Sequence, residues 1–429
     1  MDRFVAPASA VVGHIAVPGD KSISHRAVLI AAICEGATRI AGFGRSAHSE
    51  ATLGAVRALG VQVDDEEHDT LVVHGVGLGG LREPEAPIDC GNSATLMRLL
   101  TGILAGQRGR FELTGDESLR SRPMERIAEP LRRMGARVET SDGHPPLAIE
   151  GGTLAAIRYE PPVASAQVKS CLLLAGLRAR GRTQVIEPAP TRDHTEVLLA
   201  AAGAAVRRRG ASVAVTPAER LELGMVDVPG DISSAAPFVV ATTLLAGSEL
   251  TVHGVGLNPT RTAFLDLLAH MGARLTVVNR RRLGREPVGD LDVRHAELVA
   301  AAVVPGQVPA LVDELPQFAL AAGAARGESV VRGAEELRAK ESDRIEAVTT
   351  ALRSIGVRIA ATDDGFRIRG VPSRPRGGSV DSHGDHRIAM LGGIAGVVSR
   401  EGAGVAGADA VAASFPGFFD VLDDVARRP

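Results

Sequence analysis

Five segments of the chain follow one pattern, in which an apolar helical run ends at a glycine and a short β-branched segment follows. They read AVRALGVQV, LRRMGARV, LLAAAGAAV, LLAHMGARLTV and LRSIGVRI, with the glycines at Gly60, Gly135, Gly203, Gly272 and Gly356. A glycine between a helix and a strand is typical of a left-handed turn that ends the helix. Because intervals of roughly 70 to 85 residues are too long for a solenoid repeat, the pattern predicts a multiplied α/β unit.

The length of 429 residues predicts two domains of roughly 200 residues each. A single hydrophobic core stops growing before a chain reaches the full length of this one. The strand-like VVGHIAV (11–17) and the helix-like FFDVLDDVARR (418–428) predict that both termini complete one domain. VPGDKSIS (17–24) and VPGDISSA (228–235) each join a predicted strand to a helix start. We expect the chain to cross between domains there, with hinges near 19–21 and 228–231. The domains would be 1–20 with 230–429, and 21–229.

Composition excludes several classes of protein. Hydrophobic residues make up 45% of the chain and charged residues 23%, which is typical of a globular protein. No apolar run reaches the roughly 18 residues of a membrane span, so we expect a cytoplasmic protein. A formal net charge of -3 disfavours a nucleic-acid binder. The widely spaced Cys34, Cys90 and Cys171 are expected to be reduced, packed thiols.

Four predicted helix starts combine Gly, Ser or Asn with a following base. They are GDKSISHR (19–26), CGNSATLMR (90–98), ASAQVKS (164–170) and HGDHRIAM (383–390). A helix N-terminus binds anions through unpaired N–H donors, although ordinary capping explains each motif equally well on its own. In ELRAKESDR (336–344), helical spacing would put Lys340 and Arg344 on one face with Glu341 beside them. Together these segments predict sites for anionic ligands.

Two further motifs are set aside. His383 and His386 have the spacing of metal ligands, but no matching set of Cys or acidic residues accompanies them beyond Asp381 and Asp385. We expect no metal and no cofactor, and we expect both histidines to cap the helix that presents Arg387. GVGLGG (75–80) fits a dinucleotide-binding pattern, but the two prolines of LREPEAP follow where a helix is required.

Several segments together resemble the bacterial 5-enolpyruvylshikimate-3-phosphate synthases, with class II features. They are PGDKSISHR, GDESLRSRPMERIAEPLRRMGARV, ASAQVKSCLLLAGL, TRDHTE, LNPTRT, ELRAKESDR, GDHRIAM and SFPGFFDVL. The resemblance implies an α/β fold, a two-domain inside-out α/β barrel with three βαβαββ units in each domain. It also implies a monomeric transferase of aromatic amino acid biosynthesis. Such an enzyme joins phosphoenolpyruvate to the 5-hydroxyl of shikimate 3-phosphate through a tetrahedral intermediate and releases phosphate.

The resemblance assigns roles to individual residues. Shikimate 3-phosphate would be held by Lys21, Ser22, Arg26, Ser165, Ala166, Gln167, Arg192, Asp313 and Lys340. Phosphoenolpyruvate would be held by Lys21, Ala94, Arg122, Gln167, Arg344 and Arg387. Asp313 would be the base near the attacking hydroxyl, and Glu341 with Lys21 would exchange the proton of the methylene carbon. Which carboxylate performs which proton transfer stays open.

Two positions depart from the family's pattern. Ala413 stands in VAASFPGF where many relatives carry a lysine, and Ala94 stands in GNSATLMR where most carry glycine. Glycine lets a ligand approach the backbone closely. The methyl group of Ala94 is therefore expected to disfavour the inhibitor glyphosate, which is longer than phosphoenolpyruvate and occupies its site in this family.

Three alternatives remain open from the sequence. One is the sister enzyme that adds enolpyruvyl to a UDP-sugar, which usually relies on a loop cysteine that this chain lacks. Another is a paralogue that acts on a modified shikimate. The third is a non-catalytic or RNA-end-processing relative. A nucleotide-binding motif G-x-x-x-x-G-K-[ST] would favour that alternative, and the sequence contains none.

Overall fold

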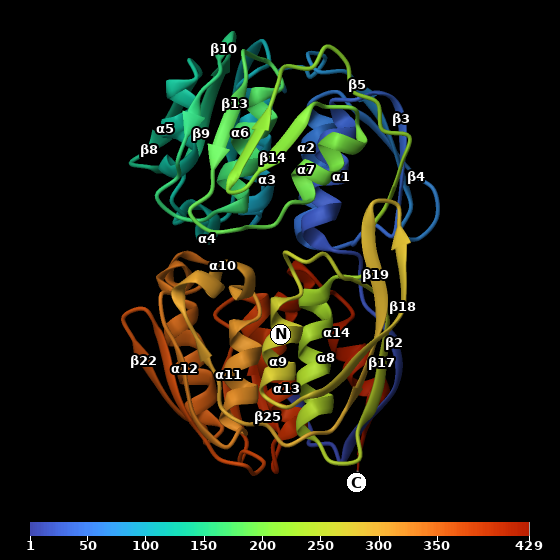
Figure 1. Cartoon of the computed structure of the whole chain (residues 1–429), viewed down its shortest axis with the longest axis vertical. Helices are drawn as coiled ribbons and strands as arrows, with labels where there is room; N and C mark the ends of the chain where they lie inside the picture. Colours follow the sequence, from blue (N-terminus) through green and yellow to red (C-terminus); the bar gives the residue numbers. More distant parts are fainter. Residues whose placement is uncertain (429) are drawn as a thin grey trace. The chain divides into compact units, whose positions relative to one another are not determined.

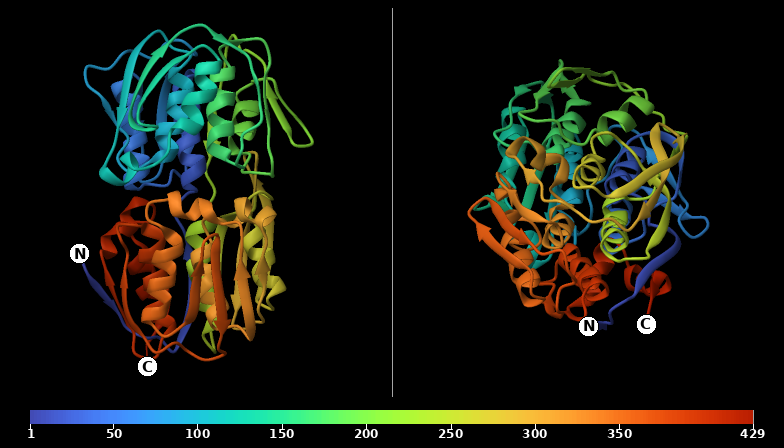
Figure 2. Two further views of the ribbon diagram at one scale, coloured as in Figure 1. Left: turned by 90° about the vertical axis from the view of Figure 1, so that its left-hand side faces the viewer. Right: turned by 60° about the horizontal axis from the view of Figure 1, so that its bottom comes forward.

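The computed structural model describes residues 1–428, which form two compact units. The terminal unit combines Met1–Asp20 with the residues from Pro229 onward, and the central unit is Lys21–Val228. In each unit, β-sheets lie on the outside and helices lie inside them (Figures 1 and 2). None of the helices in residues 1–428 is long and apolar enough to cross a bilayer.

The central unit contains three mixed four-stranded sheets and a parallel pair of short strands, β10 (Leu154–Ala155) and β12 (Ala179–Arg180). One sheet has the order β16 (Met225–Asp227), β3 (Glu35–Ala41), β5 (Leu71–Val76), β4 (Gln62–Asp65). The second has the order β6 (Ile88–Asp89), β7 (Gly109–Thr114), β9 (His144–Gly151), β8 (Arg137–Ser141). The third has the order β11 (Arg158–Tyr159), β13 (Thr183–Ile186), β15 (Ser212–Val215), β14 (Val206–Arg209). In each sheet the first two strands are parallel and the remaining pairs antiparallel, so one topology occurs three times.

Each copy in the central unit contributes two main helices. They are α1 (Lys21–Ala32) and α2 (Ala47–Ala58), α3 (Ala94–Leu104) and α5 (Glu125–Arg133), and α6 (Ala166–Gly176) and α7 (His194–Ala201). Nearly every residue of α1, α3 and α6 is buried. α3 and α6 approach closely because Gly102 has no side chain: a Cβ there would lie 2.2 Å from the carbonyl oxygen of Cys171.

The terminal unit follows the same plan. One sheet has the order β20 (Ala302–Val303), β21 (Gly327–Val331), β23 (Gly365–Gly370), β22 (Arg358–Thr362). The next has the order β18 (Arg274–Leu283), β19 (Glu286–Arg294), β17 (Glu249–Gly256), β2 (Ala10–Ala16), β26 (Ala426–Arg427). The third has the order β1 (Arg3–Val5), β25 (Ala403–Ala406), β24 (Gly378–Asp381). These repeats confirm the predicted α/β class, built from separate sheets.

The main helices of the terminal unit are also paired by copy. They are α8 (Ile232–Leu244) and α9 (Ala263–His270), α11 (Leu315–Gly323) and α12 (Arg344–Ser354), and α13 (His386–Val398) and α14 (Phe418–Val425). α8, α11 and α13 contact one another, are buried along almost their whole length and form the centre of this unit (Figure 1). Their N-terminal ends carry the site described below.

The repeat glycines occupy equivalent turns, as the sequence predicts. All five have positive φ, from 87° at Gly60 to 101° at Gly135 and Gly272. The N–H of Gly60 donates to the carbonyl of Arg57, and the N–H of Val61 donates to the carbonyl of Val56, both at 3.0 Å. The same pair of hydrogen bonds recurs at the other four glycines. Each turn ends the second helix of its copy and satisfies that helix's last carbonyl groups.

The sixth copy differs from the prediction made for the chain ends. It consists of β24, α13, β25 and α14, and α14 is followed by Ala426 instead of a glycine turn. VVGHIAV forms most of β2, which pairs with β17 in a different copy. The strand that completes the sixth sheet is β1, which pairs with β25. Three residues are too few to show a period of two in the sequence.

Candidate active site

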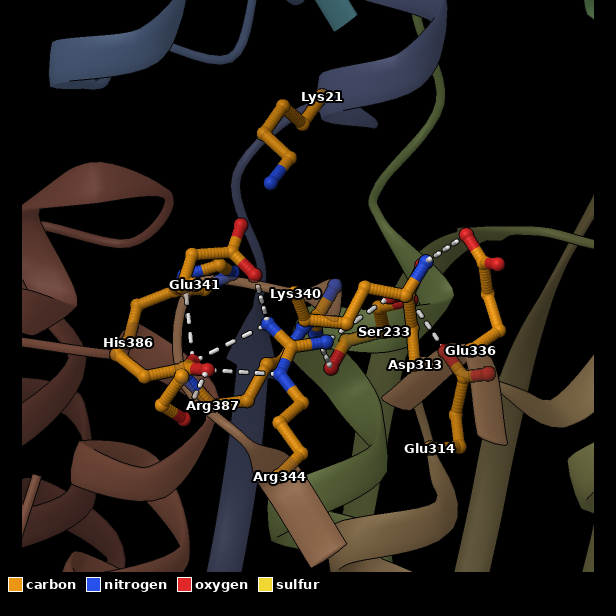
Figure 3. Close-up of polar contacts among 12 residues, drawn as sticks. Lys21, Ser233, Asp313, Glu314, Glu336, Lys340, Glu341, Arg344, His386 and Arg387 are labelled. Atoms are coloured by element: carbon orange, nitrogen blue, oxygen red, sulfur yellow. Dashed lines mark hydrogen bonds and ion pairs between the residues drawn. The ribbon is translucent and has the colours of Figure 1, made fainter. Parts of the chain in front are cut away.

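Arg344, the first residue of α12, organises the predicted site residues of the terminal unit. Its side chain is 1% exposed, and its Nη2 lies 2.5 Å from Oε2 of Glu341 and its Nη1 lies 3.4 Å from Oδ1 of Asp313 (Figure 3). Burial alone would lower the pKa of Arg344, but the charges of Asp385, Glu341 and Asp313 outweigh it and raise that pKa. Arg344 therefore stays positively charged and holds both predicted proton-transfer carboxylates.

The segment around Lys340 is not one helix, so the expected shared face is wrong. A 3-10 helix, η2 (Glu335–Ala339), ends at Lys340, whose backbone is extended. Asp343 then caps α12 by accepting the N–H groups of Ile345 and Glu346 at 3.1 and 3.3 Å. An aspartate cap at this point starts a new helix, so Lys340 and Arg344 belong to different elements.

Lys340 nevertheless lies beside the acidic residues of the site. Its Nζ is 3.9 Å from Oε1 of Glu336, and its side chain keeps 25% of its surface exposed. Burial lowers the pKa of Lys340, while the charges of Glu336 and Asp313 oppose that shift. The amine can therefore reach an anionic ligand from this position.

The start of α13 is capped by Asp385, which corrects the expectation that His383 and His386 are the caps. Oδ1 of Asp385 accepts the backbone N–H of Arg387 at 2.8 Å. His386 is the first residue of the helix, and His383 lies before it with φ of 50°. Asp385 also accepts hydrogen bonds from Arg344, and sequence analysis considered it only as a metal ligand.

Arg387 has a buried guanidinium nitrogen without a hydrogen-bond partner among the described residues. Its Nη1 donates to the backbone carbonyl of Ser233 at 3.1 Å (Figure 3). Its Nε is buried and has no hydrogen-bond partner among residues 1–428. Buried polar groups in proteins are nearly always paired, and a guanidinium edge matches a carboxylate or phosphate. The unpaired nitrogen of Arg387 therefore suits an anionic ligand.

Sequence analysis missed a buried network next to Arg387. The guanidinium of Arg261 is 4% exposed and donates from Nη1 to Asp20 at 2.8 Å. Its Nη2 donates to Oδ1 of Asp231 at 3.1 Å and to Oγ of Ser233 at 2.8 Å. Ser233 in turn donates its hydroxyl hydrogen to Oε1 of Glu314 (Figure 3). Arg261 belongs to LNPTRT, where a lone loop arginine gives no periodic or capping signal.

In the central unit, predicted residues gather at the start of α1. Lys21 is the first residue of the helix, and its Nζ lies 3.5 Å from Nδ1 of His48. Ser22 accepts at its Oγ from Nη1 of Arg192 at 3.4 Å. Ser22 also accepts at its carbonyl from Nη1 of Arg26 at 2.9 Å. The structure thus brings together Lys21, Ser22, Arg26 and Arg192.

The other predicted helix starts are confirmed as well. Ser93 caps α3 by accepting from Leu96 at 3.2 Å, which makes Ala94 its first residue. Ser165 caps α6, which begins at Ala166.

Side chains link the first turns of α3 and α6. Oε1 of Gln167 accepts from Nη1 of Arg98 at 2.5 Å, and Nε2 of Gln167 donates to Thr95 at 2.9 Å. Asn92 lies just before the cap of α3 and accepts a hydrogen bond at its Oδ1 from Nη2 of Arg122, whose side chain is buried. Gln167 is therefore joined to the α3 start that carries Ala94.

The base of the ASAQVKS motif has a different role from the one predicted. Lys169 is fully buried, and its Nζ lies 2.9 Å from Glu187 and 2.8 Å from Glu196. It also donates to the carbonyl of Thr191 at 3.5 Å. Two buried carboxylates neutralise this amine, so Lys169 fixes the segment before Arg192 and is not itself an anion ligand.

The three cysteines are packed thiols, as predicted. Cys34, Cys90 and Cys171 are unpaired and buried. Burial raises the pKa of Cys34 to about 12 and raises the pKa of the other two as well, so all three stay protonated and unreactive. Within residues 1–428, no group of three or more His, Cys, Asp or Glu side chains is arranged to hold a metal ion.

Comparison with known proteins gives one consistent result. A family model described as EPSP synthase (3-phosphoshikimate 1-carboxyvinyltransferase) matches residues 5–422. The 3-phosphoshikimate 1-carboxyvinyltransferase of Alkalilimnicola ehrlichii is 51% identical over 99% of this chain and 95% of the relative. That of an Acidithiobacillus ferrooxidans strain is 49% identical over 97% and 96%. The EPSP synthase structure from Acinetobacter baumannii is 42% identical, with a TM-score of 0.87 over 100% of this chain and 98% of that one.

Proposed function

The chain belongs to the EPSP synthase family, and we infer from this membership that it transfers the enolpyruvyl group of phosphoenolpyruvate to the 5-hydroxyl of shikimate 3-phosphate and releases phosphate. It is a transferase of aromatic amino acid biosynthesis. The relatives favour this reaction over transfer to a UDP-sugar or a modified shikimate. The observation that carries the chemistry is the buried Arg344, which holds Asp313 and Glu341 within 3.4 and 2.5 Å.

We propose that Asp313 and Glu341 of the terminal unit, together with Lys21 of the central unit, perform the proton transfers. Asp313 accepts the proton of the 5-hydroxyl as its oxygen attacks the central carbon of phosphoenolpyruvate. Glu341 and Lys21 deliver a proton to the methylene carbon, which gives the tetrahedral intermediate, and remove a proton again as phosphate leaves. Arg344 supports the steps in which Asp313 and Glu341 accept a proton, because its positive charge lies within 3.4 Å of Asp313 and 2.5 Å of Glu341 and favours their ionised forms.

Phosphoenolpyruvate is proposed to bind Arg344 and Arg387 with its anionic groups. The support is the buried Nε of Arg387, which has no hydrogen-bond partner in residues 1–428. Lys21, Ala94, Arg122 and Gln167 are proposed as its further ligands. The starts of α1 and α3 supply Lys21 and Ala94, and helix N-termini favour anions.

Shikimate 3-phosphate is proposed to bind the starts of α1 and α6. The proposed ligands are Lys21, Ser22, Arg26, Ser165, Ala166, Gln167, Arg192, Asp313 and Lys340. The contacts of Arg192 and Arg26 with Ser22 support this group, because they concentrate positive charge at one helix N-terminus. The guanidinium of Arg26 donates hydrogen bonds to Ser22, Ser170 and Thr195. Arg26 is therefore proposed to contribute a fixed positive charge to the binding of shikimate 3-phosphate.

The reaction is tested by measuring phosphate release with both substrates. We expect release only when shikimate 3-phosphate and phosphoenolpyruvate are both present. No release at millimolar concentrations of the two would contradict the proposed function. Release with phosphoenolpyruvate and a UDP-sugar instead would identify the sister reaction.

We further propose that the protein works in the cytoplasm as a monomer. The three unpaired thiols suit a reducing compartment. The exposed large hydrophobic side chains are scattered along the chain, at Met1, Phe4, Val163, Met225, Val299, Val304 and Val371. Sedimentation velocity at several concentrations tests the monomer.

A further inference from the structure

We propose that Arg261 is a positioning residue for Arg387 and acts on it through Ser233. The inference rests on the proposed binding of phosphoenolpyruvate by Arg387. Arg261 belongs to the loop between β17 and α9 and does not lie in any of the helix starts that predict anion sites. Its guanidinium is nonetheless almost fully buried and contacts Asp20, Asp231 and Ser233.

The loop that carries Arg261 is itself fixed. Oδ1 of Asn258 accepts the backbone N–H of Thr260 at 2.9 Å, and the N–H of Arg261 donates to the carbonyl of Asn258 at 2.8 Å. Nδ2 of Asn258 donates to Oε2 of Glu286 on β19 at 3.0 Å. An asparagine turn anchored to a neighbouring strand leaves the arginine little freedom of direction.

The two acidic partners of Arg261 come from the repeated VPGD segments. These segments pair in antiparallel fashion: the N–H of Asp20 donates to Pro229 and the N–H of Asp231 donates to Pro18, both at 2.8 Å. Both aspartates therefore meet one guanidinium. Burial raises the pKa of Asp231, and Asp20 adds to that shift, whereas the charge of Arg261 opposes it. Without Arg261, two buried carboxylates would face each other.

Ser233 connects Arg261 to Arg387, the residue proposed to bind phosphoenolpyruvate. Asp231 caps α8 by accepting the N–H of Ser233 at 2.9 Å, while Arg261 donates to the Ser233 hydroxyl. The carbonyl of the same Ser233 accepts from Nη1 of Arg387. Ser233 is thus held on its N–H and its hydroxyl, and its carbonyl fixes one edge of Arg387. The Nε edge of Arg387 is left for a carboxylate or phosphate oxygen.

A lysine at position 261 would keep the positive charge but lose the planar guanidinium with its separate donating nitrogens. The observed contacts use two guanidinium nitrogens in different directions, toward Asp20 and toward Asp231 with Ser233. A single ammonium group cannot reproduce that planar geometry. We expect Arg261→Lys to raise the KM for phosphoenolpyruvate roughly tenfold, because a charge-assisted contact is misplaced. The KM for shikimate 3-phosphate should change less than twofold.

The experiment measures kcat and both KM values for the full chain and four variants. Ser233→Ala removes the hydroxyl and keeps the carbonyl, so it should raise the KM for phosphoenolpyruvate in the same direction as Arg261→Lys. Arg374→Lys is the matched control, because Arg374 donates to the carbonyls of Val397, Val398 and Ser399, outside the network. It should leave both KM values unchanged.

Arg387→Gln separates the two proposals. If Arg387→Gln leaves the KM for phosphoenolpyruvate unchanged, the proposed role of Arg387 is wrong. If Arg387→Gln raises that KM while Arg261→Lys and Ser233→Ala do not, the positioning role of Arg261 alone is overturned. If Arg261→Lys raises the KM values for both substrates equally and lowers the urea midpoint, Arg261 has a structural role only. That result would also overturn the positioning role.

Discussion

Asp385 binds the guanidinium of Arg344 with both carboxylate oxygens, at 2.8 Å from Nε to Oδ2 and 3.1 Å from Nη2 to Oδ1. The same Oδ1 accepts the N–H of Arg387 at the start of α13. One buried carboxylate therefore links α12 to α13 and fixes the positions of Arg344 and Arg387, the two arginines proposed to bind phosphoenolpyruvate. A two-oxygen contact with a planar fork fixes direction as well as distance.

Asp385→Asn is expected to destabilise the protein by about 3 kcal/mol, because it removes one partner of a buried ion pair. The asparagine can still cap α13, so the helix should remain. Urea unfolding measures the loss, and phosphate release should fall at least tenfold. Asp409→Asn is the control, since its pair with the N-terminus is exposed and should matter by less than about 1 kcal/mol. Equal effects of the two variants would contradict the assigned role.

Gly102→Ala is expected to destabilise the central unit by about 2 kcal/mol or more, because its methyl group would meet the carbonyl oxygen of Cys171 between α3 and α6. Gly54→Ala is the matched control. It also lies within a helix, α2, but a Cβ there meets nothing within 4 Å, so alanine should stabilise by about 0.5 to 1 kcal/mol. Thermal unfolding of both variants gives the comparison, and the same sign for both would refute the close-packing argument.

Much of the fold follows from local signals in the sequence. Gly60 and its four equivalents are visible because a left-handed turn requires a particular backbone at one position. Ser93, Ser165 and Asp231 likewise mark helix starts through hydrogen bonds that span only two or three residues. Such features need no knowledge of the rest of the chain.

The parts that were missed depend on residues far apart in the sequence. Asp20, Asp231 and Arg261 meet only after the two VPGD segments pair, and no period or spacing records that contact. In ELRAKESDR, two local preferences compete, and the cap at Asp343 prevails over helical continuation through Lys340. Sequence periodicity alone cannot decide between them.

Asp290 gives a prediction for acid stability. Burial would raise its pKa, but hydrogen bonds from Asn279, the N–H of Gly254 and His253 outweigh it and lower the pKa of Asp290 to about 2. A carboxyl whose pKa is lower in the folded state than its unfolded value of about 3.9 stabilises the protein above pH 4 and loses that contribution as the pH falls toward 2. Asp290→Asn should therefore destabilise at pH 7, by about 1 to 2 kcal/mol, and much less at pH 2.5. Urea midpoints at several pH values test this, and a pH-independent difference would rule out the titration of Asp290 as its cause.

Ala94→Gly is expected to increase sensitivity to glyphosate. Ala94 is buried at the first position of α3, directly after the Ser93 cap, where backbone N–H groups favour an anion. Its methyl group should crowd glyphosate, which is longer than phosphoenolpyruvate, more than it crowds the substrate. The measurement compares glyphosate inhibition of the wild type and Ala94→Gly at a fixed ratio of phosphoenolpyruvate to its KM. Ala105→Gly, at the C-terminal end of the same helix, controls for the added backbone freedom, which costs about 0.5 to 1 kcal/mol. Unchanged sensitivity in Ala94→Gly would mean that the methyl group does not discriminate between the two ligands, and any tolerance would then have to arise from other groups that contact phosphoenolpyruvate.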